Sequence, residues 1–344
     1  MKNLLVCALI ILPLTAGAKE QKSIYGSDNR QELFASSSEM QKLADSVVSL
    51  WESKNIAGDG KTFRLNTMNF GQALNLCATE RFRDQPIGAF CSGTLVGEDI
   101  VMTAGHCITN ETRCADTKFV FGFAVKSEGG NAVTSIPASE VYGCKKIIKR
   151  DLSTQPTGFV SAISALIGSM INGGTGPDYA LVQLDRKVDG HKPLAINRKQ
   201  RLAKGDPMFV IGHPVGLPLK VAGDAKVRDA GPRYFFMTDL DTFGGNSGSA
   251  VFNARTNLIE GILVRGGTDF VQSPSGGCAV SYQVGQEEGK GEAVTKISAL
   301  AEYIPALKKA PAAAGKNSEA QGVEVKDSAP GNDLLNKTGE IKFQ

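Results

Sequence analysis

Short apolar runs separated by turn-forming residues dominate the chain from about residue 87 to residue 300. The runs are rich in Val, Ile, Phe and Thr, and Gly, Pro, Asn and Asp stand between them. Such runs are typical of strands, and many short strands with frequent turns favour an antiparallel barrel or sandwich over alternating strands and helices. We therefore predict an all-β fold, with strands in the segments 89–96, 99–104, 118–124, 179–185, 207–212, 234–238, 249–253 and 258–264.

The chain differs from this pattern on either side of the β region. Residues 19–70 are polar and lack strand alternation, so we interpret them as a pro-segment or an N-terminal extension. Within them, Leu43, Val47, Leu50 and Trp51 recur at helical spacing over 40–54, so a helix packed on the domain surface is the alternative. A second helix is predicted at about 298–309. Residues 311–344, rich in Ala, Lys, Gly and Asn, indicate a flexible, solvated tail.

The first 18 residues have the organisation of an export signal. Lys2 provides the positive start, residues 4–14 form an apolar stretch, and Ala16, Gly17 and Ala18 form a small-residue cleavage site. The apolar stretch is too short to span a bilayer, and no later segment is long and apolar enough to do so. We expect cleavage after Ala18, a secreted or periplasmic product and no membrane partner.

Composition sets wide limits. The chain has 344 residues, which allows a two-lobed domain with extra segments at each end. A hydrophobic content of 42% and a charged content of 21% are ordinary for a soluble globular protein. The formal net charge of +3 is small for this surface, so we expect no nucleic-acid partner. We also expect a monomer that needs no cofactor.

Six cysteines remain after removal of the signal, in a chain bound for an oxidising compartment. An even number of cysteines in that setting favours disulfides. None of them has Cys-x-x-Cys spacing, and the chain has only 3 histidines, so we expect no metal centre. The six are Cys77, Cys91, Cys107, Cys114, Cys144 and Cys278.

Three segments carry residues suited to acyl transfer. His106 directly follows an apolar strand segment, Asp178 begins another, and Ser247 lies among glycines in the segment 243–250. The histidine and the aspartate are weak signals alone, because both residue types often have structural roles. The glycines around the serine permit a tight turn that exposes a hydroxyl group. The same turn directs backbone amides at one point, and the N–H groups of Gly245 and Ser247 would stabilise an oxyanion there.

Together these segments resemble the chymotrypsin/trypsin superfamily of serine proteases. The order His106, Asp178, Ser247 is characteristic of that family, whereas α/β-hydrolases and subtilisins have other orders. Cys91 and Cys107 match the family disulfide beside the catalytic histidine. The segments 212–214 and 244–249 are closer to bacterial members, including the glutamyl-endopeptidase branch, than to animal enzymes.

The resemblance implies two six-stranded antiparallel β-barrels, chymotrypsin-like, with a C-terminal helix. We place this protease domain at 71–310, with the first barrel at about 75–190, the second at about 195–297 and the helix at about 298–309. The implied function is that of a secreted serine endopeptidase acting on polypeptides, with His106, Asp178 and Ser247 as the catalytic triad. The alternatives are a catalytically silent binding protein on the same fold, or a protease with Glu or another specificity.

The resemblance also suggests where a substrate side chain binds. Asp241 lies six residues before Ser247, at the position that forms the base of the family's specificity pocket, and would select Lys or Arg. The alternative is that Asp241 only caps a turn. Val264 and Gly266 lie on the strand that would flank extended substrate, and the pocket histidine of the glutamyl branch is missing there.

The chain departs from the family pattern at two positions. Asn246 replaces the aspartate that binds the new N-terminus in animal enzymes, so the activation step stays open. Phe243 replaces a cysteine, so Cys278 needs another partner. By proximity we favour Cys114 with Cys144, which leaves Cys77 with Cys278, although four cysteines allow three connectivities.

Overall fold

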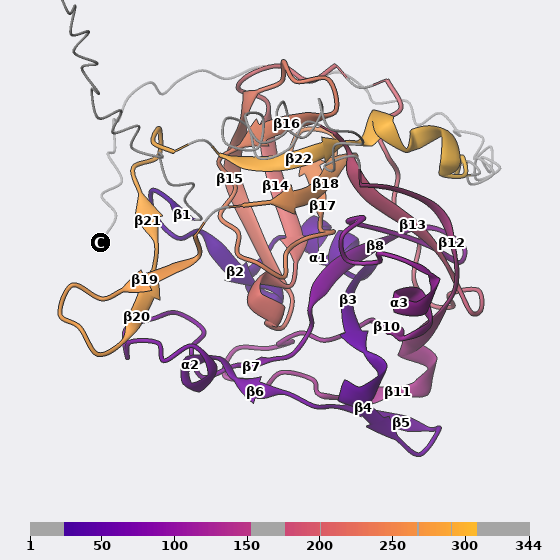
Figure 1. Cartoon of the computed structure of the whole chain (residues 1–344), viewed down its shortest axis with the longest axis horizontal. Helices are drawn as coiled ribbons and strands as arrows, with labels where there is room; N and C mark the ends of the chain where they lie inside the picture. Colours follow the sequence, from indigo (N-terminus) through magenta and orange to yellow (C-terminus); the bar gives the residue numbers. More distant parts are fainter. Residues whose placement is uncertain (1–23, 153–175, 200, 267, 290, 308–344) are drawn as a thin grey trace, which may run out of the picture. The chain divides into compact units, whose positions relative to one another are not determined.

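Six antiparallel strands close the first barrel (Figure 1). Their order around the barrel is β10-β12-β13-β9-β8-β3, and pairing of β3 with β10 closes the ring. The computed structural model describes residues 24–152, 176–199, 201–266, 268–289 and 291–307, so the predicted signal and the tail lie outside it. The barrel strands are β3 (Val47–Glu52), β8 (Cys91–Gly97), β9 (Ile100–Thr103), β10 (Thr117–Val120), β12 (Val141–Leu152) and β13 (Asp178–Leu184).

Six further strands form a second barrel in the order β14-β17-β18-β22-β16-β15, which a pairing of β14 with β15 closes. The short strand β2 (Arg30–Glu32) adds to its outside by pairing with β15. The prediction of two six-stranded antiparallel barrels is therefore confirmed. The strands are β14 (Pro207–Gly212), β15 (Lys220–Asp229), β16 (Phe235–Thr238), β17 (Ala250–Asn253), β18 (Ile259–Arg265) and β22 (Glu292–Lys296).

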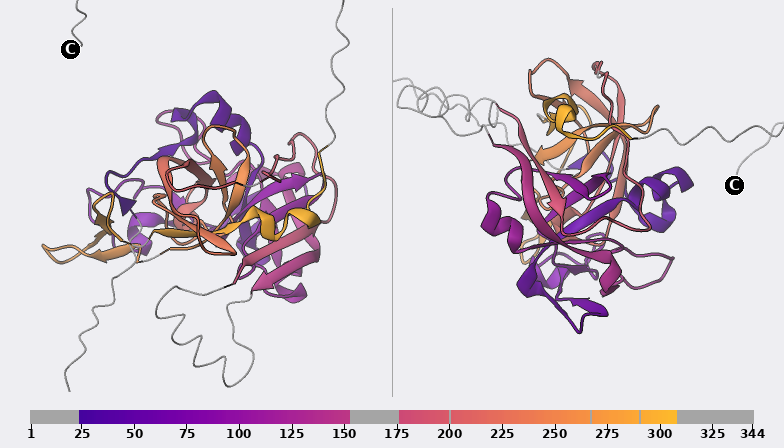
Figure 2. Two further views of the ribbon diagram at one scale, coloured as in Figure 1. Left: turned by 90° about the horizontal axis from the view of Figure 1, so that it is seen from above. Right: turned by 90° about the vertical axis from the view of Figure 1, so that its right-hand side faces the viewer.

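The two barrels share apolar packing. One buried cluster includes Leu181 of the first barrel with Phe209 and Ile262 of the second. Burial of such side chains is the main favourable contribution to folding. Figure 2 shows the barrels as two halves, the first in purple to pink and the second in salmon to orange. This shared packing holds the two barrels together.

The N-terminal region belongs to both barrels. The helical spacing over 40–54 predicted one helix, but the structure has the short helix α1 (Ser38–Ala44) followed by β3. Residues 47–51 are all buried, so this strand has no alternation of polar and apolar positions. That is why its pattern could be mistaken for a helix face. Residues 24–70 thus contribute strands β2 and β3 to the barrels, whereas we placed the start of the protease domain at residue 71.

The C-terminal helix is not confirmed. The described part of the segment has two single 3₁₀ turns, η5 (Ile297–Ala299) and η6 (Ala301–Tyr303), because Leu300 between them has non-helical backbone angles. Residues 308 and 309 of the predicted helix lie outside the described chain. Within the described residues, no helix is long and apolar enough to cross a membrane.

Short elements surround the barrels and are held by disulfides. The predicted pairings Cys91–Cys107, Cys114–Cys144 and Cys77–Cys278 are all present. The last of these joins the segment after α2 (Phe70–Ala73) to the hairpin of β19 (Phe270–Gln272) and β20 (Ala279–Ser281). The remaining elements are β1 (Ile24–Tyr25), β4 (Ile56–Gly58), β5 (Thr62–Leu65), β6 (Met68–Asn69), β7 (Pro86–Ile87), β11 (Ser135–Pro137), β21 (Gln283–Val284), α3 (Glu111–Ala115), and the 3₁₀ turns η1 (Leu33–Ala35), η2 (Ser53–Asn55), η3 (Ala138–Glu140) and η4 (Pro214–Gly216).

Candidate active site

The first barrel brings His106 and Asp178 together at one edge. His106 follows the end of β9, Asp178 begins β13, and these two strands are paired. Oδ2 of Asp178 lies 2.8 Å from Nδ1 of His106. Oδ1 of the same carboxylate accepts a hydrogen bond of 3.1 Å from the backbone N–H of His106. The carboxylate therefore orients both the ring and the backbone of the histidine.

Gly105 makes this approach possible. A Cβ atom at this position would come within 2.5 Å of the carbonyl oxygen of Asp151 and 2.9 Å of that of Tyr179. Any side chain would thus push the turn away from β12 and β13. The carbonyl group of Gly105 accepts a hydrogen bond of 2.8 Å from Nε of Arg150, which also holds the turn against β12.

Asp178 is buried, with only 2% of its surface exposed, whereas the His106 side chain is 38% exposed. The backbone of Asp178 is hydrogen-bonded to Thr295 of the second barrel. The N–H of Asp178 donates to Oγ1 of Thr295 at 3.1 Å, and this hydroxyl donates to the carbonyl oxygen of Asp178 at 3.0 Å. Thr295 belongs to β22. The carboxylate is consequently fixed by both barrels, while the imidazole faces solvent.

Ser247 lies in the loop between β16 and β17, whose backbone is sharply turned. Gly245 has φ of 83° and Gly248 has φ of 92°, conformations that side chains disfavour. The N–H groups of residues 244, 246, 248 and 249 all donate hydrogen bonds within the protein. Those of Gly245 and Ser247 have no acceptor among the described residues. They are therefore available to an oxygen atom from outside.

Ser92 of β8 fastens this loop to the first barrel. Its N–H donates to the carbonyl oxygen of Ser247 at 2.9 Å, and its Oγ donates to that of Gly245 at 3.0 Å. Sγ of Cys107 lies 3.7 Å from the same carbonyl oxygen of Ser247. Because Cys107 directly follows His106, these contacts bring the serine loop next to the histidine turn.

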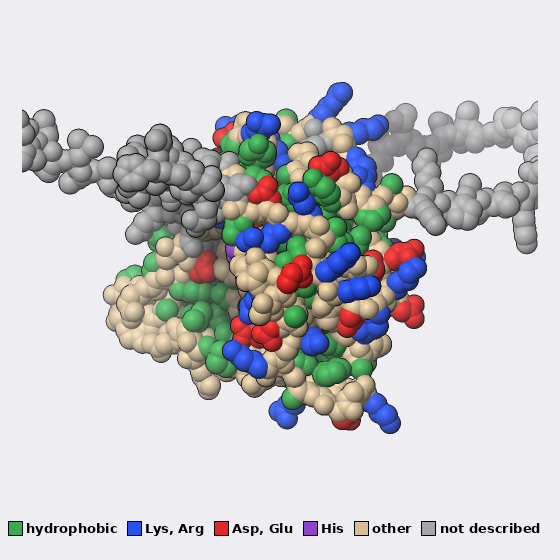
Figure 3. Space-filling model, turned by 45° about the vertical axis from the view of Figure 1, so that its right-hand side comes forward, with side chains coloured by type: hydrophobic (Ala, Val, Ile, Leu, Met, Phe, Trp, Pro, Cys, Tyr) green, Lys and Arg blue, Asp and Glu red, His purple; other side chains and the backbone are tan. Residues whose placement is uncertain are grey.

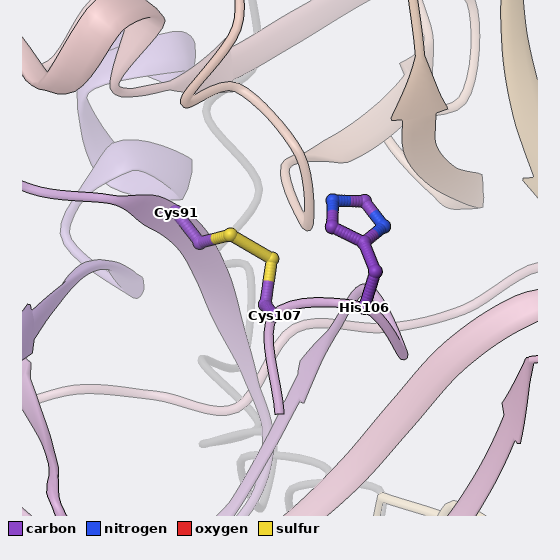
Figure 4. Close-up of side chains that lie close together, drawn as sticks. All are labelled: Cys91, His106 and Cys107. Carbon is purple, nitrogen blue, oxygen red and sulfur yellow. A yellow bond between two sulfur atoms is a disulfide. The ribbon is translucent and has the colours of Figure 1, made fainter. Parts of the chain in front are cut away.

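The disulfide Cys91–Cys107 lies beside His106 (Figure 4). The ligand atoms of these three residues are within 4.8 Å of one another, an arrangement that could suggest a metal site. Thiolates bind metals, but here the two sulfur atoms are joined to each other. The cluster therefore functions as a structural link that supports the histidine turn.

A pocket of about 140 Å³ opens beside Ser247. Gly266 lines it, as the sequence led us to expect, whereas Val264 is buried and is not part of the lining. The walls come from the serine loop, from the end of β18 and from the start of β22. The lining residues are Thr242, Phe243, Gly244, Ser247, Leu263, Arg265, Gly266, Asp269 and Glu292.

Asp241 does not line this pocket. It is fully buried, and its two oxygens accept hydrogen bonds from the N–H groups of Tyr25 at 2.8 Å and Asn29 at 3.0 Å. Burial raises the pKa of Asp241 to about 6, although these hydrogen bonds oppose the shift. The expectation that Asp241 forms the base of the pocket is therefore replaced by an anchoring role for the N-terminal segment.

Comparison with known proteins decides the family. A family model described as a trypsin-like peptidase domain matches residues 91–262, half of the chain. The chain belongs to this family. No curated protein matches it.

Two solved structures are similar to this chain. One is the VesB protease of Vibrio cholerae, with a TM-score of 0.45 and 16% identity over 80% of this chain; the chain spans 66% of that protein's length. The other is a Glu endopeptidase solved in complex with MPD, with a TM-score of 0.43, 15% identity, and coverage of 82% of this chain and 97% of that one.

The structure accounts for the two departures from the family pattern. Asn246 is buried, and its Oδ1 lies 3.3 Å from Oγ of Ser249, so it serves the serine loop internally. The ring of Phe243 packs under the guanidinium of Arg30, 3.9 Å from its centroid, and against Phe270. The space of the missing cysteine is thus filled by an aromatic side chain that contacts the N-terminal segment.

Sequence reasoning missed Glu292, Asp269 and Arg265 as pocket residues. The available signal was the acidic residue Glu292 directly before the apolar residues 293 and 294, since a carboxylate at a buried position needs a partner or a function. Sequence spacing could not reveal that Glu292 lines the same pocket as Ser247, because 45 positions and five strands separate them.

Proposed function

We propose that the peptidase is a serine endopeptidase that cleaves polypeptides through an acyl-enzyme at Ser247. The observation that supports this most strongly is the pair formed by His106 and the buried Asp178, at 2.8 Å. A buried carboxylate on Nδ1 leaves Nε2 as the proton acceptor, which is the tautomer that a general base needs. The serine loop next to this turn supplies the nucleophile.

In the first step, Nε2 of His106 takes the proton of Ser247 as Oγ attacks the peptide carbonyl carbon. The bond between Oγ and carbon forms, the C–N bond breaks, and the histidine gives its proton to the leaving amine. Water then attacks the ester by the same route and restores the serine hydroxyl. Asp178 stabilises the imidazolium that forms in both steps.

The free N–H groups of Gly245 and Ser247 support the proposal that the transition state is stabilised here. When the carbonyl carbon becomes tetrahedral, its oxygen carries a negative charge, and fixed amide donors stabilise that charge without reorganising. The left-handed backbone at Gly245 helps direct both donors outward.

Chemical labelling tests the proposal and separates it from a catalytically silent binding protein. Incubation with a fluorophosphonate should attach one phosphonyl group to Ser247, which peptide mass spectrometry would locate. Ser247→Ala should abolish labelling and reduce kcat on casein peptides by about 10⁴- to 10⁶-fold. Ser275→Ala, at an exposed hairpin position, is the control. Equal hydrolysis by the parent and Ser247→Ala would refute the mechanism.

We further propose that the protein is exported with cleavage after Ala18 and that residues 24–70 remain in the active enzyme. The three disulfides support an oxidising compartment. The barrel strand β3 supports retention of the N-terminal region, because its removal would expose the edges of β8 and β10. Export of the full chain followed by N-terminal sequencing tests both points; a mature terminus beyond residue 46 would contradict the second.

A further inference from the structure

Two neighbouring contacts join the serine loop to the hairpin of β19 and β20. Asp269 directly precedes β19, and its Oδ2 accepts a hydrogen bond of 2.8 Å from the N–H of Gly244. The ring centroid of Phe270, the next residue, lies 4.7 Å from that of Phe243, which precedes Gly244. Two consecutive residues of one segment thus contact two consecutive residues of the other.

No disulfide makes this connection within the described chain. The three disulfides join residues 77 and 278, 91 and 107, and 114 and 144, and none of these residues lies in the serine loop. Position 243, where the family pattern has a cysteine, is occupied by phenylalanine. The hydrogen bond from Gly244 and the aromatic contact of Phe243 therefore attach the loop to the hairpin.

Asp269 is itself fixed at the base of the hairpin. Its carbonyl oxygen accepts a hydrogen bond of 2.9 Å from the N–H of Tyr282, just beyond the end of β20. Phe270 pairs with Ser281 in the hairpin, and its ring packs edge-on to Phe70. A carboxylate with this support can hold a more flexible segment in place.

Gly244 is such a segment. It is exposed, and glycine has more conformational freedom than any other residue. Asp269 binds its N–H, and the N–H of Val215 donates to its carbonyl oxygen. Because peptide units are planar, these two bonds fix the peptides on both sides of Gly244. The second of these peptides ends in the N–H of Gly245, one of the two donors assigned to the oxyanion.

Asp269 also lines the pocket beside Ser247, so direct contact with the substrate is the alternative role. Its Oδ2, however, is already engaged by the N–H of Gly244. A Cβ atom added to Gly244 would lie 3.1 Å from this oxygen, so the carboxylate rests directly against the loop. These contacts favour a role that acts through Gly244.

We propose that Asp269 is a positioning residue for the oxyanion site. Its carboxylate fixes Gly244 and thereby keeps the N–H of Gly245 directed at the carbonyl oxygen of the substrate. This inference rests on the proposed function, since it assigns Asp269 to the transition state formed at Ser247. Molecules in which the peptide turns away lack one oxyanion donor, so the rate falls with the fraction of competent molecules. That factor is the same for every peptide.

Two substitutions separate the hydrogen bond from the charge. Asp269→Ala removes the acceptor and should lower kcat/KM by about tenfold, the factor that corresponds to one hydrogen bond. Asp269→Asn removes the charge but keeps an oxygen that accepts from the N–H of Gly244, so it should stay within about threefold of the parent. Each protein is assayed on four fluorogenic peptides, with Ala, Phe, Lys or Glu before the scissile bond. The loss in Asp269→Ala should be equal on all four.

A peptide boronic acid reports on the oxyanion site itself. It forms a tetrahedral adduct with the serine, so its inhibition constant should rise by about tenfold in Asp269→Ala, in parallel with the loss of kcat/KM. The corresponding peptide alcohol forms no such adduct and should inhibit parent and variant equally. A purely structural role of Asp269 would not separate the two inhibitors.

Asp229→Ala is the matched control. Asp229 also accepts a hydrogen bond of 2.8 Å from a glycine N–H, that of Gly231, at an exposed position outside the pocket. Acidic and basic side chains are interspersed on the face that Figure 3 shows, so a single carboxylate makes little difference to the overall field there. The control should keep parental activity on all four peptides.

Fluorophosphonate labelling of the parent comes first, because absence of both labelling and cleavage would overturn the proposed function itself. With a labelled parent, three results would overturn only the role of Asp269. These are unchanged kcat/KM in Asp269→Ala, a loss confined to some of the four peptides, and equal losses in Asp269→Ala and Asp269→Asn. If Asp269→Ala does not fold, Asp269→Glu, whose longer side chain displaces the acceptor, takes its place with the same expectations.

Discussion

Asp178 holds His106 at two atoms, with Oδ2 at 2.8 Å from the ring nitrogen Nδ1 and Oδ1 at 3.1 Å from the backbone nitrogen. Each contact requires an acceptor oxygen, and an amide side chain can offer only one oxygen. A neutral isostere therefore tests the electrostatic and the orienting roles together.

Asp178→Asn should reduce kcat/KM on peptides by roughly 10⁴-fold, because the amide would leave the histidine in the wrong tautomer. The exposed Asp189→Asn serves as the control and should retain full activity. Steady-state kinetics on one fluorogenic peptide measures both. A loss of less than about tenfold would show that Asp178 does not orient the base.

Ser92→Ala should destabilise the protein and loosen the serine loop. Oγ of Ser92 donates to the carbonyl oxygen of Gly245 and accepts from the N–H of His213, and the residue is fully buried. The substitution leaves both partners unsatisfied, so we expect a loss of about 1 to 3 kcal/mol in the free energy of unfolding. Urea denaturation measures the loss, with Ser275→Ala as the exposed control. An unchanged midpoint would contradict this assignment.

Removing the disulfide Cys77–Cys278 should loosen the hairpin of β19 and β20. The bond closes a loop with a sequence separation of 201, and Cys278 is half-buried in the hairpin. The double variant Cys77→Ser, Cys278→Ser should lose about 2 to 5 kcal/mol in the free energy of unfolding. Since Asp269 of the pocket directly precedes β19, KM should rise more than kcat falls. A variant with parental KM would show that the pocket rim holds its position without the bond.

Stability should depend on pH through His191. Its Nε2 lies 2.7 Å from Glu140, its Nδ1 lies 3.0 Å from Asp45, and its ring stacks on Phe121. Burial lowers the pKa of His191, but the hydrogen bonds to Glu140 and Asp45 outweigh burial and raise it above the ordinary value. A raised pKa stabilises the fold fully below about pH 6.5, and this contribution is lost as the pH rises through the folded-state pKa.

Urea denaturation of the parent and His191→Gln, each at about pH 5.5 and about pH 9, measures this contribution. The difference in the free energy of unfolding between the two proteins should be larger at the lower pH. A difference that grows at the higher pH would have the wrong sign for a charged His191.

Truncation tests the role of the N-terminal region. A chain that begins at Ile24 should fold, because it keeps β1, β2 and β3. A chain that begins at residue 71 lacks β3 and should not reach a folded state, since five consecutive buried residues of the first barrel are lost. Circular dichroism and fluorophosphonate labelling of both chains provide the measurement. A folded, labelled chain that begins at 71 would revive the idea of a long pro-segment.

The barrels were predictable because strand signals are local. Each of the eight predicted segments overlaps a barrel strand, from β8 at Cys91–Gly97 to β18 at Ile259–Arg265. The strand β3 escaped because both of its faces are buried, which removes the alternation that marks a half-exposed strand. The predicted helix at about 298–309 is not confirmed, because η5 and η6 are separate 3₁₀ turns of three residues each.

The candidate catalytic residues were predictable because each lies in a local sequence motif. The pocket residues were not, because their positions depend on contacts between distant parts of the chain. His106, Asp178 and Ser247 stand in local patterns that sequence reveals. Asp241 looked like the base of the pocket from its offset to Ser247, but Tyr25 and Asn29 bind its carboxylate from more than 200 positions away. Only the folded chain shows that Asp269 and Glu292 are the acidic residues in the pocket wall instead.

Trp51 is the single tryptophan of the chain, and it is fully buried in the first barrel, edge-on to Phe123. Intrinsic fluorescence excited at the indole band consequently senses one half of the molecule and is blind to the loop that carries Ser247. If the second half melts first, emission will stay native while turnover has already vanished. The difference between the melting curve followed by tryptophan emission and the one followed by activity measures how strongly the two halves depend on each other, without any added label.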